Sequence, residues 1–452
     1  MSIGEVTLGE ILAARESRVA RQKALLSAYR CSLICLTLNI PGPQKVTPKT
    51  ERVFRIAVDM VLTRLGAMGL PEVQCQLVNA LTGSEGYFMV ELPARMLKAA
   101  MVELEDYRPL SRLFDLDVLD ADGTKLSRSD LGFPSRKCLL CDRPAPVCAR
   151  SRAHSLDALQ ARVQELINDT LEEDNGNRMA SLAVKALLYE ACAAPKPGLV
   201  DRIDQGSHAD MDIFSFLSSA STLQPYFSTC FRRGRDTRTV PPQETFRQLR
   251  LPGMLAETEM YRATGGVNTH KGAIFSLGVV CGALGRMDDA DRRNPENICA
   301  MCAAMTEGLT RQELSARGNT VHVTNGEQAY RTHSIGGVRA MAEQGYPAVL
   351  HSGLPTLRSG LSRGLTLEQA GCAALVALMA DCDDTNLIAR GGIEALQQVK
   401  QQADALLAQK ELPDFQILSQ WNQEMTARQL SPGGSADLLA LTYFLHFLER
   451  ND

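Results

Sequence analysis

The first third of the chain mixes strand-like and helix-like patterns of apolar positions. Short apolar runs that alternate or are continuous, and that end at turn residues, are typical of strands. Pro93 suits the first position of a helix, which we expect to run to about Asp106. The turn sequence at 120–123 predicts a hairpin after the last of these runs. The strands are expected at residues 31–40, 73–77, 86–92 and 112–119.

From Ser155 onward the apolar spacing becomes helical, and almost no strand pattern follows. The polar run 172–177 predicts a linker. Capping-box patterns beginning at Thr310 and Thr366 predict two helix starts, and Ser435 precedes a terminal apolar helix.

These patterns predict a multidomain protein. We expect an N-terminal α+β domain at residues 1–178 and a C-terminal all-α domain at residues 179–452.

Composition excludes several classes of protein. The 452 residues are 45% hydrophobic and 22% charged, which allows a buried core and excludes a disordered chain. A net charge of −4 and a single tryptophan argue against an extended nucleic-acid-binding surface. No apolar run is long enough for a membrane span, and the first residues lack the apolar core of a signal peptide. With 13 cysteines, an odd number, we expect a cytoplasmic protein with reduced thiols, and no nucleic-acid or membrane partner.

Two acids in the fourth strand are the first candidates for chemistry. Asp115 and Asp117 should share a face of the strand, with their Cα atoms about 6.5 Å apart. Two carboxylates in this arrangement can hold Mg²⁺ against substrate phosphates. The alternative is an exposed strand face with two solvated acids.

A group of cysteines follows the acid pair. Cys138, Cys141, Cys148 and His154 could supply four zinc ligands, although their irregular spacing favours ordinary reduced thiols. The stretch 128–152 is also basic. It is either an ordinary solvated surface or a dock for CoA phosphates or an acidic carrier protein.

The sequence around these residues resembles a known family. The segments RLFDLDV at 112–118, LSR at 126–128, GFP at 132–134 and CLLC at 138–141 are similar to the citrate lyase holo-carrier synthase family. That family is the apo-citrate lyase phosphoribosyl-dephospho-CoA transferase, and the resemblance covers about residues 1–178.

The resemblance implies a nucleotidyltransferase-like fold and a protein substrate. Phosphoribosyl-dephospho-CoA would be transferred to a serine of the citrate lyase acyl carrier subunit, with release of diphosphate. Asp115 and Asp117 would then be catalytic and hold Mg²⁺, and Arg112 and Arg128 would bind substrate phosphate. The superfamily places a Gly-Ser pair shortly before its acids, whereas Gly83-Ser84 lies far upstream here, which puts its phosphate-binding role in doubt.

Five polar islands interrupt the helical part of the chain. Each joins glycine or proline to charged or hydroxyl residues, as loops at helix ends do, and helix N-termini attract phosphates. The islands lie at 195–201, 206–211, 265–272, 383–392 and 431–437.

Together the islands resemble the triphosphoribosyl-dephospho-CoA synthase family over nearly all of residues 179–452. That family joins ATP to 3′-dephospho-CoA: the 2′-hydroxyl attacks the anomeric carbon of the ATP ribose, and adenine leaves. The resemblance implies His208 or His270 as proton carrier, and Asp201, Asp210 and Asp384 as Mg²⁺ ligands. Lys271, Arg390, Ser435 and Asp437 would bind the substrates or their phosphates. The whole chain would be a bifunctional enzyme that makes the citrate lyase prosthetic group and attaches it.

Two alternatives remain open from the residues alone. Asp381 and Asp384 lie one helical turn apart, as in all-α Mg²⁺-diphosphate enzymes of prenyl chains, which would require a deep apolar pocket. A zinc-binding regulatory protein built on the cysteine group would require a larger basic face than the sequence pI of about 6.1 favours.

Overall fold

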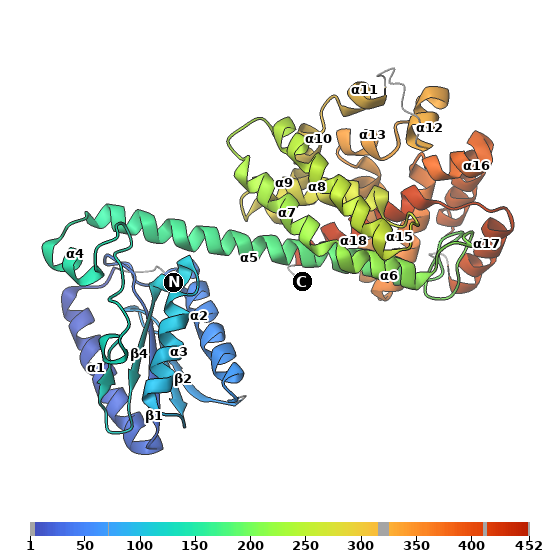
Figure 1. Cartoon of the computed structure of the whole chain (residues 1–452). Helices are drawn as coiled ribbons and strands as arrows, with labels where there is room; N and C mark the ends of the chain where they lie inside the picture. Colours follow the sequence, from blue (N-terminus) through green and yellow to red (C-terminus); the bar gives the residue numbers. More distant parts are fainter. Residues whose placement is uncertain (1–4, 71, 315–324, 410–413, 451–452) are drawn as a thin grey trace. The chain divides into compact units, whose positions relative to one another are not determined.

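The computed structural model describes residues 5–70, 72–314, 325–409 and 414–450. The chain divides into two compact units, Met1–Glu172 and Glu173–Asp452 (Figure 1). Within the described ranges, no helix is both long enough and apolar enough to cross a membrane.

The N-terminal unit is built on one antiparallel sheet. Its five strands lie in the order β2-β3-β1-β4-β5. The expectation of a mixed helix and strand region is confirmed, and each of the four expected strands is present with slightly shifted ends. The elements are α1 (Leu8–Tyr29), β1 (Ser32–Leu38), α2 (Pro48–Ala67), β2 (Gln74–Val78), β3 (Glu85–Val90), α3 (Ala94–Asp106), the 3₁₀ turn Pro109–Leu113, β4 (Phe114–Leu119), β5 (Lys125–Leu126), the 3₁₀ turn Ser129–Leu131 and α4 (Ala145–Ser151).

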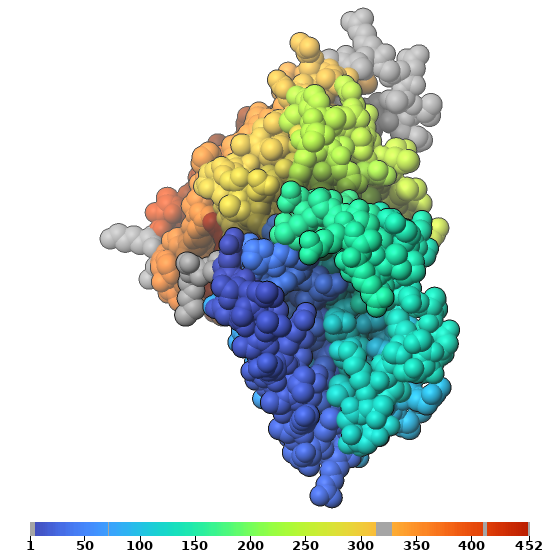
Figure 2. Space-filling model, turned by 90° about the vertical axis from the view of Figure 1, so that its left-hand side faces the viewer, coloured from blue at the N-terminus to red at the C-terminus, as the bar shows by residue number. Residues whose placement is uncertain are grey.

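The two faces of the sheet differ in chemistry because strand side chains alternate. One face carries Ile34, Leu36 and Val118 and forms the main apolar core with α2 and α3. The other carries a smaller apolar cluster, including Leu33 and Tyr87, against α1. Helix α1 buries only Leu26 and is the exposed dark blue strip in Figure 2. The charged residues of this sheet therefore gather on the α1 side.

The C-terminal unit is helical, and its described residues contain no strand. The helices are α6 (Ile213–Thr222), α7 (Gln224–Asp236), α8 (Pro242–Ala263), α9 (Lys271–Arg286), α10 (Pro295–Met305), α11 (Leu309–Leu314), α12 (Asn325–His333), α13 (Gly337–Glu343), α14 (Leu354–Ser362), α15 (Leu367–Asp381), α16 (Thr385–Leu407), α17 (Phe415–Ala427) and α18 (Gly433–Arg450), with short turns at Asp291–Arg293 and Val349–Gly353.

Three of these helices form the centre of the unit. Most residues of α9, α15 and α18 are buried, so burial extends beyond the single apolar stripe of a surface helix. Three of the five polar islands, at 265–272, 383–392 and 431–437, lie at the beginnings of α9, α16 and α18 and extend into these helices. Packing of the central helices α9 and α18 therefore places two of these islands.

The expected linker at 172–177 is wrong. The run lies inside one continuous helix, α5 (Leu156–Cys192), whose earlier part contributes Val163 and Ile167 to the N-terminal core. Its polar residues have partners in the C-terminal unit: Asn175 contacts Asp289 at 3.3 Å and Ser228 donates to Asn177 at 3.0 Å. Polarity here reflects specific contacts on a helix surface, not a break in the helix.

Of the two expected capping boxes, one is present. Thr366 caps α15 in both directions with Gln369. Thr310 instead lies inside the first turn of α11, where its backbone N–H donates to Glu343 at 3.0 Å. At the start of α11, Glu343 of α13 therefore accepts the backbone N–H bonds, a role that the sequence pattern had assigned to the Thr310 side chain.

Candidate active sites

The acid pair lies on the α1 face of β4. In the β1–β4 register, Asp115 lies opposite Thr37 and Asp117 lies opposite Cys35, so the two carboxylates share this face. Asp115 is exposed and Asp117 is half-buried. Across the sheet, Glu85 of β3 is buried and pairs with Arg18 at 2.9 Å and Arg21 at 3.1 Å. The polar part of this face is therefore a patch of carboxylates edged by arginines of α1.

A cavity of about 320 Å³ opens beside Asp115. Arg15, Arg18 and Lys45 line it together with Gly83 and Ser84. The Gly-Ser pair is thus near the first acid in space although it is distant in sequence, because β3 and β4 flank the same strand, β1. The doubt raised by its sequence position does not apply to the folded protein.

The two acids have different surroundings. Partial desolvation raises the pKa of Asp115, and the negative charge of Asp117 raises it further, while Lys125 and Arg136 act in the opposite direction. Asp117 forms an ion pair with Lys125 at 2.6 Å. A cation bound between the acids would relieve the repulsion that raises the pKa of Asp115.

Arg112 and Arg128 are held by protein groups. Arg112 donates to the carbonyls of Lys137 and Cys138 at 2.7 and 2.8 Å. Arg128 pairs with Glu105 at 3.1 Å and Asp106 at 2.9 Å, and only 12% of its side chain is exposed. These contacts favour structural roles for both arginines over the predicted phosphate binding.

The cysteine group is assembled. Cys138, Cys141, Cys148 and His154 bring their ligand atoms within 4.8 Å of one another.

In the C-terminal unit, a cavity of about 590 Å³ collects residues from all five polar islands. The residues that line it come from positions 187–440 and include acidic residues, basic residues and several glycines. The predicted residues that line it are His208, Asp210, His270, Lys271, Asp384, Arg390 and Asp437.

Asp201 and Ser435 do not line this cavity. Asp201 is buried and accepts backbone N–H bonds from Lys196 at 2.9 Å and Ile203 at 2.7 Å, which shape the first island. Ser435 is buried and donates through its backbone N–H and its hydroxyl to Asp384 at 2.8 and 3.1 Å. Both residues therefore organise the walls of the site and are not positioned to touch a substrate in it.

Asp384 caps helix α16 and has no free acceptor sites. One carboxylate oxygen accepts from the backbone of Asn386 and Leu387, and the other accepts twice from Ser435. A carboxylate offers about four lone-pair positions, and all four are used. Burial raises the pKa of Asp384, which these bonds oppose. The expected role as a direct Mg²⁺ ligand does not fit this bonding.

Asp437 lies at the start of helix α9. It accepts a backbone hydrogen bond from Ala273. A Cβ at position 272 would overlap the Oδ2 atom of Asp437, so Gly272 is needed for this close approach. Burial raises the pKa of Asp437 well above its usual range, and the charges of Glu190 and Asp384 raise it further. A protein carboxyl therefore occupies the helix end at which a phosphate was expected.

Glu190 and Lys196 form a buried ion pair on the same cavity that the sequence did not single out. Their side chains are 5% and 1% exposed, and Lys196 also donates to the Glu190 carbonyl at 2.7 Å. Burial raises the pKa of Glu190, which Lys196 opposes. In the sequence, Lys196 is one lysine inside a proline-containing island, and Glu190 is one acid near the end of an expected helix. These features are too general to predict that the two side chains form a pair.

His270 is a neutral histidine. Its Nδ1 atom shares a hydrogen bond of 2.7 Å with the Ser219 hydroxyl, while its buried Nε2 atom has no hydrogen-bond partner among the described residues. Burial, reinforced by the charge of Lys196, lowers the pKa of His270 to about 3. It can exchange a hydrogen bond with a substrate but does not carry a charge near neutral pH.

His208 has a different set of partners. Arg390 approaches its Nδ1 atom at 3.3 Å, and its Nε2 atom lies 2.9 Å from the Ser431 hydroxyl. Because guanidinium can only donate, Nδ1 is the acceptor and Nε2 carries the proton. Burial and Arg390 lower the pKa of His208, and Asp210 at 3.8 Å opposes them. Arg390 also donates to the carbonyls of Ser207 and Gln429.

Lys271 faces the cavity from the first residue of α9. Its ammonium pairs with Glu257 at 3.1 Å, and 44% of the side chain is exposed. Lys271 and Arg390 are the predicted phosphate-binding cations that are exposed and line this cavity, and Lys271 has Glu257 as its carboxylate partner.

Two features bear on the expected metal site and on the alternative of a prenyl-chain enzyme. Within the described residues, no group of three acids comes as close together as the cysteine group does, so Asp201, Asp210 and Asp384 are not gathered as a ready metal site. Asp381 lies outside the cavity and accepts from Ser352 at 2.8 Å. Acidic and basic side chains line the cavity together with apolar ones, whereas a prenyl-chain enzyme requires a deep apolar pocket.

Comparison with known families assigns each unit separately. Residues 6–170 match the model of apo-citrate lyase phosphoribosyl-dephospho-CoA transferase, and residues 176–452 match that of ATP:dephospho-CoA triphosphoribosyl transferase. The chain is therefore a bifunctional transferase.

Relatives carry both parts in one chain. Protein CitXG of Haemophilus influenzae is 36% identical over 98% of this chain and 97% of its own length, and Protein CitXG of Leuconostoc mesenteroides subsp. cremoris is 33% identical over 97% of each. A probable 2-(5''-triphosphoribosyl)-3'-dephosphocoenzyme-A synthase of Citrobacter koseri is 42% identical over 59% of this chain and 89% of its own length. The chain belongs to the family that fuses the two transferases, and it makes the triphosphoribosyl-dephospho-CoA precursor and attaches the prosthetic group to citrate lyase.

Proposed function

We propose that the two reactions take place at the two cavities described above, one in each unit. The 590 Å³ cavity would join ATP to 3′-dephospho-CoA with loss of adenine. The acid face of β4, on a nucleotidyltransferase-like fold, would transfer phosphoribosyl-dephospho-CoA to a serine of the acyl carrier subunit, with loss of diphosphate.

One observation carries this division. The resemblance of each half to its family draws on residues confined to that half, and the C-terminal candidates meet on one cavity although they span 208–437 in sequence. The family ranges, 6–170 and 176–452, also meet close to the division between the compact units. Domains at 1–178 and 179–452 are consistent with both.

In the C-terminal cavity, His208 would take the proton from the attacking 2′-hydroxyl. Arg390 keeps Nδ1 of His208 occupied while the cavity is empty. If Arg390 turned to a substrate phosphate, its charge would be neutralised and Nδ1 would be released, so the pKa of His208 would rise toward its ordinary value. Substrate binding would thus prepare the base.

His270 would act as a neutral hydrogen-bonding group through its unpartnered Nε2 atom. The raised pKa of Asp437 suits a carboxyl that gives a proton to the leaving adenine. Glu190 and Asp384 would supply negative potential beside an oxocarbenium-like centre, and Lys271 would bind the triphosphate.

Mg²⁺ is expected as the partner of the triphosphate, and its fit differs between the sites. Asp115 and Asp117 share a face and repel each other, which suits a shared cation. In the C-terminal cavity, Asp210 is 64% exposed and has one distant partner, so it fits better than Asp384 or Asp201, whose oxygens are engaged. Mg²⁺ would neutralise phosphate charge at both sites.

In the N-terminal unit, Arg15, Arg18 and Lys45 line the cavity beside Asp115. These side chains would bind the phosphates of the triphosphoribosyl group, with Gly83-Ser84 providing close backbone approach. The carrier serine would enter from the open side of β4, where Asp115 is exposed.

The test is to incubate the full chain with ATP, Mg²⁺ and 3′-dephospho-CoA, with and without apo-acyl carrier subunit. We expect free adenine in both reactions, and a mass increase of the carrier in the reaction that contains it. Supplying pre-made triphosphoribosyl-dephospho-CoA should label the carrier without adenine release. Adenine release that requires the carrier would contradict two separate sites.

A further inference from the structure

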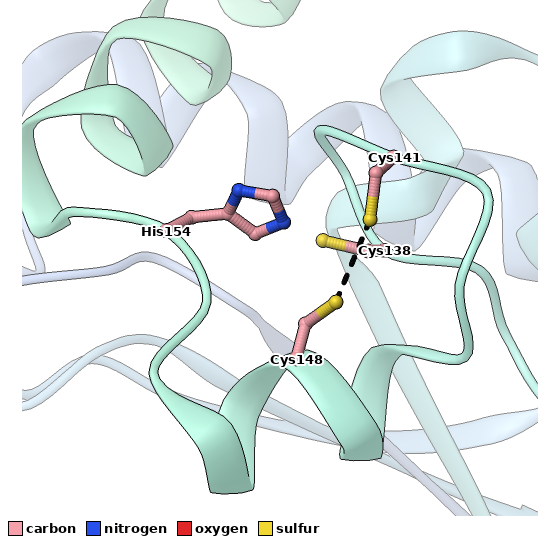
Figure 3. Close-up of side chains that lie close together, drawn as sticks. All are labelled: Cys138, Cys141, Cys148 and His154. Atoms are coloured by element: carbon pink, nitrogen blue, oxygen red, sulfur yellow. Dashed lines mark hydrogen bonds between the residues drawn. The ribbon is translucent and has the colours of Figure 1, made fainter.

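Four side chains outside the proposed active sites meet at one point in the N-terminal unit. They are Cys138, Cys141, Cys148 and His154, and their ligand atoms all lie within 4.8 Å of one another. Figure 3 shows the three sulfur atoms and the imidazole ring directed at a common centre. Neither proposed reaction uses this group.

The spacing of the atoms suits a tetrahedral zinc ion. Ligands about 2.3 Å from a central zinc are about 3.8 Å apart, so small rotations from the observed arrangement would complete the site. The sulfurs of Cys141 and Cys148 lie 3.5 Å apart, which is too far for a disulfide bond. Three cysteines and one histidine are also a usual ligand set for structural zinc.

The backbone holds the group in place from both sides. Lys137 and Pro144 form an antiparallel bridge, and the Cys138 N–H donates to the Arg143 carbonyl at 2.8 Å, so the first two cysteines lie on a tight hairpin loop. Cys148 follows on α4, and the Ala153 N–H donates back to its carbonyl at 3.1 Å, which returns the chain toward His154.

The histidine has a property that points to a missing ligand. Its Nε2 atom is buried and makes no hydrogen bond within the part of the chain that the structure describes. A buried polar atom without a partner costs about 1–3 kcal/mol, so such atoms are uncommon. Cys138 and Cys148 are also buried, with 6% and 5% of their surfaces exposed. Cys141 and His154 are half-buried.

We propose that Cys138, Cys141, Cys148 and His154 bind one Zn²⁺ ion, which holds the segment 127–155 in its folded form. All four positions of a tetrahedral ion would be filled by protein, leaving none for a substrate, so the zinc would be structural. The cysteine thiols would lose their protons on binding. The irregular spacing of these residues in sequence, which favoured ordinary thiols, does not matter once the loop and α4 bring them together.

The zinc loop is joined to the strand that carries the acid pair. Arg112, just before β4, donates to the carbonyls of Lys137 and Cys138. Arg136 donates to the carbonyls of Phe114 at 2.9 Å and Arg112 at 2.7 Å. Loss of zinc should therefore loosen the start of β4 and weaken carrier loading, while adenine release by the C-terminal unit continues.

The first experiment measures metal in the full chain, purified under reducing conditions and without chelators. We expect about one equivalent of zinc per chain. Cys148→Ser should retain at least tenfold less, since serine is a poor zinc ligand, whereas Cys75→Ser, which removes an exposed cysteine of β2, should retain the full amount. Equal zinc in Cys148→Ser and the unmodified chain would overturn the assignment.

A second measurement does not depend on a variant that folds. Zinc is removed from the unmodified chain and replaced by Co²⁺, which should give the thiolate-to-cobalt absorption and the intense visible bands of a tetrahedral sulfur site. No metal in the purified chain together with no cobalt spectrum would overturn the proposal, as would a Cys141–Cys148 disulfide found by mass spectrometry in the purified protein. Because these readouts do not use catalysis, they stand or fall separately from the proposed reactions.

Discussion

The two units build their sites in opposite ways. In the N-terminal unit, the two acids are separated by one residue on one strand, and the first of them is exposed. In the C-terminal unit, the acids are far apart in sequence. Asp384 caps α16, and Asp437, near the N-terminus of α18, places its carboxylate at the start of α9, so that both accept backbone bonds.

This difference has a chemical consequence. An acid pair with one exposed and one half-buried member remains available to a metal ion and to a protein substrate as large as a carrier subunit. In the C-terminal cavity, burial and the charges of Glu190 and Asp384 raise the pKa of Asp437, which suits proton transfer and electrostatic support for a small nucleotide. The two proposed sites would therefore suit substrates of different size.

The largest effect should come from breaking the N-terminal acid pair. Asp115→Asn should reduce carrier loading on the order of a thousandfold, because the amide keeps the shape but removes the charge needed to hold a cation. Adenine release should remain unchanged. Labelled carrier and free adenine are measured in the same reaction, with Asp122→Asn in the exposed hairpin turn as the matched control. Normal loading by Asp115→Asn would remove it from the site.

A change at Lys271 should have the opposite result: adenine release falls while carrier loading is kept. Lys271→Ala should slow adenine release about a hundredfold, since one well-placed charge on a developing or bound anion is worth roughly that much. Carrier loading from supplied triphosphoribosyl-dephospho-CoA should be normal. Arg262→Ala, which removes an exposed partner of Glu259, should leave both steps intact. If Lys271→Ala fails to load even from the intermediate while its circular dichroism is native, the two-site division is wrong.

A smaller effect should come from displacing Asp437 without changing it. In Gly272→Ala the added methyl group would overlap Oδ2 of Asp437, so that carboxyl must move from the start of α9. We expect adenine release to fall about tenfold to thirtyfold, because misplacing a proton donor costs roughly 1–2 kcal/mol in the barrier. Gly253→Ala is the control, since its Cβ would meet Tyr226 at an ordinary 3.6 Å. Equal rates in both variants would argue against a role for the position of Asp437.

The last expected effect is on stability rather than on a reaction rate, and it involves His270. Its pKa of about 3 in the folded protein lies below the value of about 6.5 for an unfolded chain, so acid favours the unfolded state. The contribution of neutral His270 is therefore complete above pH 6.5 and is lost progressively as pH falls toward 3. Between pH 7 and pH 5 this group should cost about 2 kcal/mol of unfolding free energy.

The measurement uses Trp421, the single tryptophan, which is buried in the C-terminal unit and reports its unfolding alone. The unfolding free energy is measured with denaturant at pH 7 and at pH 5. Its decrease between the two pH values should be about 2 kcal/mol smaller for His270→Gln than for the unmodified chain. Ser219→Ala is a useful companion, because it removes the hydrogen bond to Nδ1 but keeps the histidine. The same pH dependence in His270→Gln and the unmodified chain would show that His270 is not held neutral.

Local patterns were sufficient for much of this molecule. The strands, the capping box at Thr366 and the absence of strand patterns beyond Ser155 depend on residues close together in sequence, because periodicity and caps are properties of a single element. The shared face of Asp115 and Asp117 also follows from the pleat of one strand. The two family resemblances rest on motifs of the same short range.

What the tertiary structure decided concerns groups that meet from different elements. Asp384 caps α16, and Ser435 from the first turn of α18 occupies its second carboxylate oxygen, so the expected metal ligand is instead a helix cap. The polar run in α5 is helical, and Asn175 and Asn177 find partners in other elements, namely Asp289 in the turn after α9 and Ser228 on α7. Likewise, Cys148 reaches Cys141 only through the hairpin loop and α4. Sequence spacing specifies distances along one strand or helix. Whether a polar side chain binds a ligand or a neighbouring residue depends instead on packing between elements. Each acceptor has a limited number of lone pairs, and only the folded chain shows which donors occupy them.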